Sequence, residues 1–260
     1  MQRYAACIEY CGCRYVGWQR QKNQLSVQEV VENAISHVAD QTVSSVTAGR
    51  TDTGVHATGQ VIHFDCDAVR TDYNWVRGIN THLPDDVSMV WIKPVDVGFH
   101  ARFGAIRRRY RYVLLNRRVA PGWLNGLVSW SPLPLDLETM QSGAENLVGE
   151  HDFSAFRAAG CQSKQPVKTV CDLTLTRHGD FVCVDIEANG FLHHMVRNIV
   201  GSLIRVGEHL ETADWIDAVL HSKDRKLAGV TAPPDGLYFA RVTYAPEFDL
   251  PEPSPMPRFW

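Results

Sequence analysis

The chain has 260 residues, of which 45% are hydrophobic and 21% are charged, and its formal net charge is −3. These values are ordinary for a globular protein and allow a sizeable core in one large or two modest domains, so disorder is not expected. No apolar run approaches the roughly 18 residues that a membrane span needs, and the first residues lack the regions of a signal peptide. With seven cysteines, an odd number, these features indicate a cytoplasmic protein with reduced thiols and no membrane partner.

The first half of the chain alternates predicted strands and helices. Residues 2–10 place apolar side chains two positions apart, which predicts a strand. A capping box formed by Ser26 and Glu29 predicts the start of an amphipathic helix, which continues to Val38. The same criteria predict half-buried strand character over 60–65, a helix over 73–82, and strands over 87–95 and 103–115.

The second half repeats this mixture. Residues 121–134 are punctuated by proline and glycine and mark a boundary. Periodicity then predicts helices over 137–148, 192–207 and 213–220, a hairpin of strands over 170–177 and 181–188, and a last strand over 237–244. We therefore expect an α+β protein with two subdomains, 1–120 and 135–247, joined through their sheets, and a tail at 248–260. A ligand would bind in the cleft between the subdomains.

One stretch, residues 48–60, concentrates groups that can carry chemistry. It contains three glycines together with Arg50, Asp52 and His56. Glycines and short polar residues let a backbone turn sharply and hold a side chain toward a cleft. The stretch therefore predicts an active-site loop with Arg50 and Asp52 at its centre. Taken alone, an arginine and an aspartate so close together are more often a structural ion pair.

The densest cationic segment is 107–118, where six arginines surround Tyr110 and Tyr112. A charge run is usually a solvated face. Alternation along a strand would place Tyr110 on one face with Tyr112, a pattern typical of surfaces that stack a base beside phosphates. Arg157, Lys164 and Lys168 form a second basic loop.

Three cysteines near the N-terminus, Cys7, Cys11 and Cys13, invite comparison with a metal site. No second Cys/His pair stands nearby at zinc spacing, so buried thiols or chance are favoured. The histidines His56, His63, His193 and His194 show no zinc-binding spacing either, and we expect structural or RNA-contacting roles for them. No metal site is predicted.

Three segments resemble the TruA-type tRNA pseudouridine synthase family. They are Gly-Trp-Gln-Arg-Gln at 17–21, the ten residues at 48–57, and His-His-Met-Val-Arg-Asn-Ile-Val-Gly at 193–201. The ending at 232–237 is similar to the last motif of the same family. Cys11 departs from the family pattern, which has an acidic residue in its opening motif.

The resemblance implies two α/β subdomains of RNA-recognition-like topology around a mostly antiparallel central sheet. It also implies isomerisation of uridine to pseudouridine at positions 38, 39 and 40 of the tRNA anticodon stem-loop, without cofactor or metal, by a homodimer. Asp52 would be the catalytic nucleophile, and Tyr110 would stack on the target base. Arg50 and Arg197 would be charged neighbours, with Arg50 filling the place of the displaced base, and Leu237 would pack against the uracil.

Two other functions compete with this reading. A non-catalytic RNA-binding protein would need only the basic strands and aromatics. A glycoside hydrolase would also use carboxylates at an anomeric carbon, but it needs a second carboxyl group roughly 5 to 10 Å away, and no second acid stands out. A zinc base deaminase is excluded because the Pro-Cys-x-x-Cys signature is missing.

Overall fold

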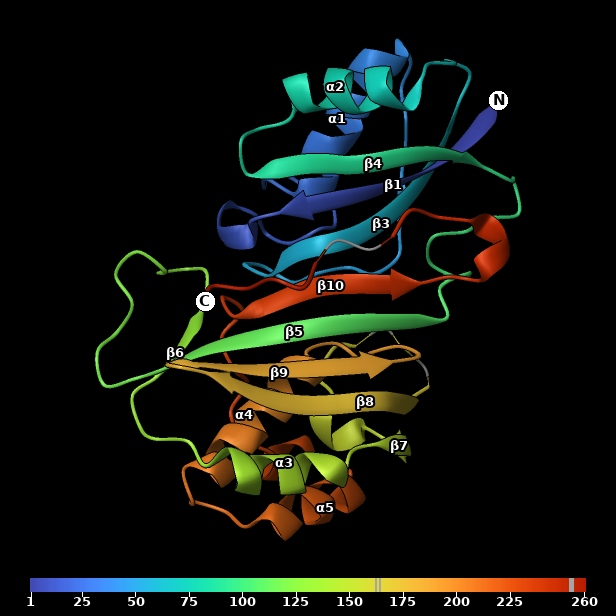
Figure 1. Cartoon of the computed structure of the whole chain (residues 1–260). Helices are drawn as coiled ribbons and strands as arrows, with labels where there is room; N and C mark the ends of the chain where they lie inside the picture. The colour runs from blue at the N-terminus through green and yellow to red at the C-terminus, as the bar shows by residue number, and fades with distance from the viewer. Residues whose placement is uncertain (162, 164, 253–254) are drawn as a thin grey trace. The chain divides into compact units, whose positions relative to one another are not determined.

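A computed structural model describes residues 1–161, 163, 165–252 and 255–260, so Lys164 of the second basic loop lies outside the described part. The chain forms two compact units (Figure 1). The first unit contains Met1–Ile106 and Tyr238–Pro257, and the second contains Arg107–Leu237 and Arg258–Trp260. The division expected from the sequence, with continuous domains over 1–120 and 135–247 and a tail over 248–260, stays a prediction. The compact units run differently, because the first unit recruits the strand that follows residue 237.

The first unit follows the strand and helix order of an RNA-recognition fold. Its elements are β1 (Gln2–Tyr10), α1 (Val27–Ala39), β2 (Val46–Thr47), β3 (His56–Cys66), α2 (Asp72–His82), β4 (Val87–Val95) and β10 (Leu237–Thr243). The sheet order is β4-β1-β3-β10, with β2 also paired to β3. All pairs are antiparallel except β3 with β10. The predicted α+β class and RNA-recognition-like order are therefore found here.

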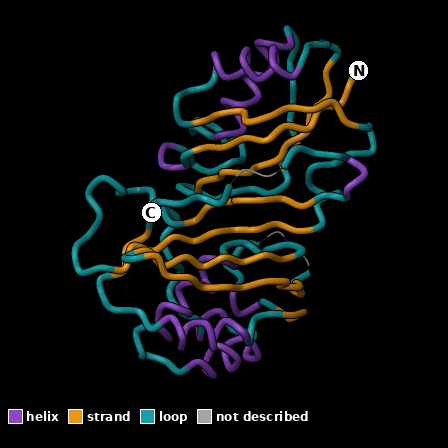
Figure 2. Tube along the Cα trace, viewed as in Figure 1, coloured by secondary structure: helices purple, strands orange, loops and turns teal. Residues whose placement is uncertain are grey.

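Helices α1 and α2 pack together beside this sheet (Figures 1 and 2). Val31 and Ile35 of α1 and Trp75 of α2 are fully buried. Trp75 meets Phe64 of β3 edge-on, with ring centroids 6.1 Å apart. The apolar stripe that predicted α1 is thus the face that covers the sheet.

Strand β3 is more buried than its alternating sequence indicated. The expectation of a half-buried strand over 60–65 is wrong, because Gln60 and His63 are buried as well as their apolar neighbours. Both polar side chains have internal partners. Gln60 Nε2 donates to the Gly49 carbonyl at 2.6 Å, and His63 Nδ1 accepts from the Ala101 N–H at 3.1 Å. Polar side chains with internal partners can be buried. The sequence of β3 therefore alternates between polar and apolar residues although neither face of the strand is exposed to solvent.

The N-terminus of α1 is capped differently from the prediction. Ser26 is the residue that precedes the helix, but its side chain makes no capping hydrogen bond, and among the described residues its Oγ has no partner. The carbonyl of Gly17 instead accepts from Val27 N at 3.2 Å, and that of Trp18 accepts from Gln28 N at 2.9 Å. Two carbonyls of the preceding loop therefore satisfy the first two N–H groups of the helix, those of Val27 and Gln28.

The strands of the second unit are also mostly antiparallel. Its elements are β5 (Arg107–Asn116), β6 (Ser129–Ser131), α3 (Leu137–Glu145), β7 (Gly149–Asp152), β8 (Val167–His178), β9 (Phe181–Ala188), α4 (Met195–Gly207) and α5 (Ala213–Ser222). The sheet order is β5-β9-β8-β7, with β6 added parallel to β5. The predicted hairpin is β8-β9, which turns at Gly179 with φ 57°.

Helices α3, α4 and α5 gather together in this unit (Figure 1). Most of α4 is buried, including two polar residues, Asn198 and Ser202. Asn198 Nδ2 donates to the Phe156 carbonyl at 2.7 Å, and Ser202 Oγ donates to the Asn198 carbonyl at 2.9 Å. Within the described part of the chain, no helix combines the length and the hydropathy that crossing a bilayer requires.

Candidate active site

The stretch at 48–55, which we call the Asp52 loop, joins β2 to β3 in the first unit. Its first end is fixed to β3: Ala48 N donates to the Val61 carbonyl at 2.8 Å, and the Gly49 carbonyl accepts from the Gln60 side chain. Its other end closes a turn in which Val55 N donates to the Asp52 carbonyl at 3.1 Å. Gly54 takes φ 80° in this turn, a conformation that glycine adopts without strain.

Thr51 anchors the centre of the loop. Its hydroxyl lies 2.8 Å from the Tyr10 hydroxyl in a buried hydrogen bond, and its carbonyl accepts from Trp18 N at 3.1 Å. Burial raises the pKa of Tyr10 well above its usual value, so Tyr10 stays a neutral hydrogen-bonding group. The residue before Asp52 is thus held by both a strand and the loop that caps α1.

Backbone packs directly against the Asp52 loop at two glycines. A Cβ on Gly17, which has φ 98°, would lie 2.3 Å from the Thr51 carbonyl oxygen. A Cβ on Gly12 would lie 2.1 Å from the Val55 carbonyl oxygen. Both distances are far below van der Waals contact, so these positions admit only glycine unless the loop moves. The motif at 17–21 therefore packs against the backbone of the Asp52 loop and helps to set its conformation.

The predicted charged pair, Arg50 and Asp52, lies on the exposed side of the Asp52 loop. Asp52 is partly exposed and Arg50 is exposed. His56, in contrast, is buried, and its Nδ1 accepts from the Gly12 N–H at 3.0 Å. Its ring stacks on Tyr238 at a centroid distance of 4.6 Å. The structural role expected for His56 fits these contacts, whereas Asp52 keeps a carboxylate that a ligand can reach.

Tyr110 lies on β5 in the second unit, opposite Ile186 of β9. Its ring meets Phe191 edge-on at 4.9 Å, and the residue is 9% exposed. The neighbour on the same face, Tyr112, is completely buried and its hydroxyl donates to the Pro233 carbonyl at 2.8 Å. The expectation that Tyr112 belongs to a base-stacking surface is therefore wrong.

The arginines on the other face of β5 are held by carboxylates of the neighbouring strands. Arg111 makes two hydrogen bonds to Asp185, at 2.7 and 2.6 Å, and both side chains are buried. Arg109 pairs with Asp172 at 2.7 Å, and Arg107 pairs with Glu187 at 3.2 Å. Much of the cationic segment thus serves internal ion pairs.

Arg197 and Leu237 are brought close through the segment at 229–237. Arg197 Nε donates to the Ala232 carbonyl at 2.7 Å, and Ala232 N donates to the Arg197 carbonyl at 3.1 Å. Leu237 is 5% exposed, and its N–H donates to the Pro234 carbonyl at 2.8 Å. The segment also reaches β5, where Val113 N donates to the Gly236 carbonyl at 2.8 Å. Of the segments that the resemblance singled out, 232–237 therefore packs on the strand of Tyr110, and 193–201 is linked to 232–237 through Arg197.

A strained residue precedes α4. His194 occupies the N-cap position with φ 59°, a left-handed conformation that costs a non-glycine residue about 1–3 kcal/mol. Its carbonyl accepts from Asn198 N at 2.9 Å and starts the helix that carries Arg197. Strain of this kind clusters at functional sites.

Several residues that support the candidate site were not identified from the sequence. Tyr10 and Gln60 hold the Asp52 loop, and Ser129 holds the segment of Leu237 by accepting from Gly236 N at 3.1 Å. Tyr10 and Gln60 sit at inward positions of strands, which is the only signal that could have pointed to them. The Asp52 loop and the group around Tyr110 belong to different units, so their meeting stays a prediction.

Comparison with known proteins decides the family. A profile described as tRNA pseudouridine synthase matches residues 6–104 and 144–245. The chain belongs to this family. The matched ranges of this synthase family include Arg50, Asp52, Arg197 and Leu237, but Tyr110 lies outside both. The resemblance drawn from the sequence is confirmed.

Relatives match this family member over nearly their whole length. Proteins named tRNA pseudouridine synthase A from Colwellia psychrerythraea and Idiomarina loihiensis are each 52% identical, over 257 and 258 residues, and cover 99% of this chain and 99% and 98% of their own. One from Legionella pneumophila strain Corby is 51% identical over 257 residues, with 99% and 98% coverage. Among solved structures, a chain of a Cbf5-Nop10-Gar1 complex is 12% identical with a TM-score of 0.35, covering 91% of this chain and 48% of that one. A score this low establishes no structural equivalence.

Proposed function

We propose that the chain isomerises uridine to pseudouridine at positions 38, 39 and 40 of the tRNA anticodon stem-loop, with Asp52 as nucleophile and without a cofactor. That it is a tRNA pseudouridine synthase, an isomerase, follows from family membership. The finer proposal is supported chiefly by the rigid setting of Asp52. Thr51, directly before it, is held by two hydrogen bonds, and the loop presents a partly exposed carboxylate.

The reaction needs a carboxylate at such a position. The bond between N1 of uracil and C1′ of ribose breaks as the Asp52 carboxylate attacks C1′ or stabilises its positive charge. The uracil then turns, C5 bonds to C1′ as the carboxylate leaves, a base removes the proton from C5, and N1 takes up a proton. Reactants and product have the same atoms, so no oxidant or reductant is required.

The remaining predicted residues have roles around the target base. The target uridine must leave its stack, which costs a few kcal/mol, and exposed Arg50 would fill the vacated place. Tyr110 would stack on the uracil and Leu237 would pack against it. Arg197, fixed by Ala232, would supply positive charge beside the Asp52 carboxylate. A cytoplasmic homodimer would extend the basic surface offered to tRNA, since one chain carries a net charge of −3.

Tritium release from tRNA labelled with 5-³H-uridine tests the nucleophile. We expect Asp52→Asn to lower the rate more than about 1,000-fold while tRNA binding persists. Asp67→Asn is the matched control, because Asp67 is an exposed aspartate that pairs with the terminal amine. Equal release by wild type and Asp52→Asn would overturn the proposal and favour a non-catalytic role for this carboxylate.

Substrates with uridine at single positions test the site on tRNA. Release is expected when uridine occupies 38, 39 or 40 and is lost when cytidine replaces all three. Persistent release from the triple replacement would refute the anticodon assignment while leaving the synthase activity intact. Unchanged rates after dialysis against a chelator are expected for a reaction without a metal.

A further inference from the structure

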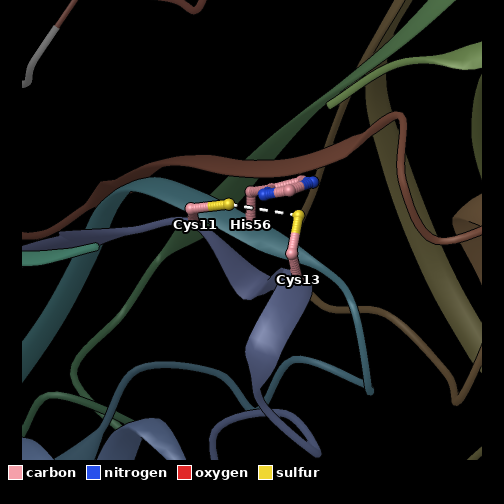
Figure 3. Close-up of side chains that lie close together, drawn as sticks. All are labelled: Cys11, Cys13 and His56. Atoms are coloured by element: carbon pink, nitrogen blue, oxygen red, sulfur yellow. Dashed lines mark hydrogen bonds between the residues drawn. The ribbon is translucent and has the colours of Figure 1, made fainter. Parts of the chain in front are cut away.

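Two thiols and an imidazole meet beside the Asp52 loop in the first unit. Cys11 and Cys13 flank Gly12 at the start of a 3-10 helix, Gly12–Arg14, and the Cys11 Sγ donates to the Cys13 Sγ at 3.2 Å (Figure 3). His56 comes to them from β3, with its ring lying over the two sulfurs in this view. Cys13 is exposed and Cys11 is half-buried, so reagents in solution can reach the pair.

We propose that Cys11 and Cys13 form a dithiol modification site that reacts with low-molecular-weight disulfides and closes to an internal Cys11–Cys13 disulfide, with His56 promoting attack by Cys11. This inference does not depend on the proposed function. It would make the turn beneath the Asp52 loop sensitive to the thiol–disulfide balance of the surroundings.

The electrostatics of the cluster assign the attacking thiol. A hydrogen bond with His56, and further ones with Cys13, lower the pKa of Cys11 to about 7, so that much of it is thiolate at neutral pH. Two fully buried thiols, Cys183 and Cys66, are less reactive by comparison. Burial raises the pKa of Cys183 to about 12 and also raises that of Cys66.

The reaction balances as an ordinary exchange. The Cys11 thiolate attacks one sulfur of the external disulfide, forms a mixed disulfide and releases one thiolate. The Cys13 thiolate then attacks the Cys11 sulfur, forms the internal bond and releases the second thiolate. Two protein thiols are oxidised, and the external disulfide is reduced to two thiols.

The geometry favours this bond over a metal ion. Two thiolates on a tetrahedral zinc, each about 2.3 Å from the metal, lie about 3.7 Å apart. The sulfurs here are closer, at 3.2 Å, and would have to approach by about 1 Å to reach the S–S bond length of about 2.05 Å. His56 Nδ1 already accepts from the Gly12 N–H at 3.0 Å, so metal binding through that nitrogen would cost a buried hydrogen bond.

Oxidised glutathione, added to the reduced full-length protein, tests the proposal. We expect wild type to lose the mass of two hydrogen atoms, with the link mapped by fragmentation to Cys11 and Cys13. Cys13→Ser should instead retain one glutathione on Cys11, since the resolving thiol is gone. Cys11→Ser should slow reaction at Cys13 by about tenfold or more. Cys171→Ser, which removes an exposed cysteine elsewhere, should behave as wild type.

Three results would overturn the proposal. The first is stable glutathione addition to wild type without an internal bond, and the second is a bond that maps to other cysteines. The third is tight binding of one Zn²⁺ by the reduced protein that both cysteine variants abolish and that occurs without disulfide formation, which would assign the cluster to a metal. Thermal melts of each variant separate these outcomes from misfolding.

Discussion

Gly17→Ala tests whether the loop that caps α1 also positions Asp52. The new Cβ would lie 2.3 Å from the Thr51 carbonyl oxygen and 2.9 Å from the Asp52 carbonyl carbon. Both neighbours are backbone atoms, so no flexible side chain can move aside. The substituted residue must also keep φ 98°, outside the range that alanine prefers.

The expected loss of stability in Gly17→Ala has two contributions. A left-handed backbone costs a non-glycine residue about 1–2 kcal/mol. The clash adds to this, because the Thr51 carbonyl must retreat by about 1 Å and strain its hydrogen bond from Trp18, which brings the total to about 3 kcal/mol. A shift of about 1 Å at Asp52, the proposed nucleophile, can lower turnover about 100-fold.

Gly179→Ala provides a matched control. Gly179 also has positive φ, at 57°, but a Cβ there meets no atom within 4 Å. Gly179→Ala should lower the free energy of unfolding by about 1 kcal/mol and the melting temperature by about 3 °C. For Gly17→Ala the melting temperature should fall by about 9 °C. Tritium release should fall only in Gly17→Ala, with little change in tRNA binding. Unaltered turnover in a destabilised Gly17→Ala protein would refute the claim that Gly17 positions Asp52.

Three further outcomes are expected. Asp185→Asn should destabilise the protein by about 3–5 kcal/mol in denaturant titration, because it leaves the Arg111 guanidinium buried without its carboxylate; replacing both by apolar residues should cost less. Burial lowers the pKa of His63 to about 4, below the unfolded value near 6.5, so the unfolded chain takes up the proton at a higher pH than the folded protein does. The free energy of unfolding should therefore fall by up to about 3 kcal/mol between pH 6.5 and pH 4. His63→Gln should remove this dependence on pH. Alkylation of Cys11 by iodoacetamide should reach half its maximal rate near pH 7, and a midpoint near 8.5 in wild type would contradict the role of His56.

Elements with one buried face were predictable from periodicity. The strand expected over 87–95 is β4 with the same bounds, and that expected over 181–188 is β9. Strand β2, with two residues, and β6, with three, are too short to show any period. These short strands form because β3 and β5 have free edges with which they can pair. Their positions therefore depend on the tertiary structure and not on a local sequence pattern.

Ends of elements were less predictable. Serine and glutamate in the right spacing indicated how α1 starts, and the start was found at Val27. The hydrogen bonds at that end come from Gly17 and Trp18, because tertiary contact supplies acceptors that a local pattern cannot show. The strand expected from residue 103 begins only at Arg107, as β5, because the chain still forms a turn at Gly104.

The candidate site was predictable only where a motif was continuous. Asp52 was identified by the ten residues around it, and its role stays a prediction. Its supports, Tyr10 and Gln60, are ordinary strand residues in the sequence and acquire their role through folding. The proximity of His56 to Cys11 and Cys13 was missed for the same reason, because more than forty residues separate them.

The return of β10 to the first unit has a consequence for biosynthesis. Tyr238 and Phe239 pair with His56 and Ala57 of β3, so this edge waits for a strand made after residues 107–237 of the second unit. At about 5–20 residues per second, the ribosome takes on the order of ten seconds to produce the intervening chain. During that interval the nascent first unit exposes part of a strand edge next to the Asp52 loop, a surface suited to transient binding by a chaperone. The strand that begins where the Asp52 loop ends would therefore gain its partner β10 only near the end of translation.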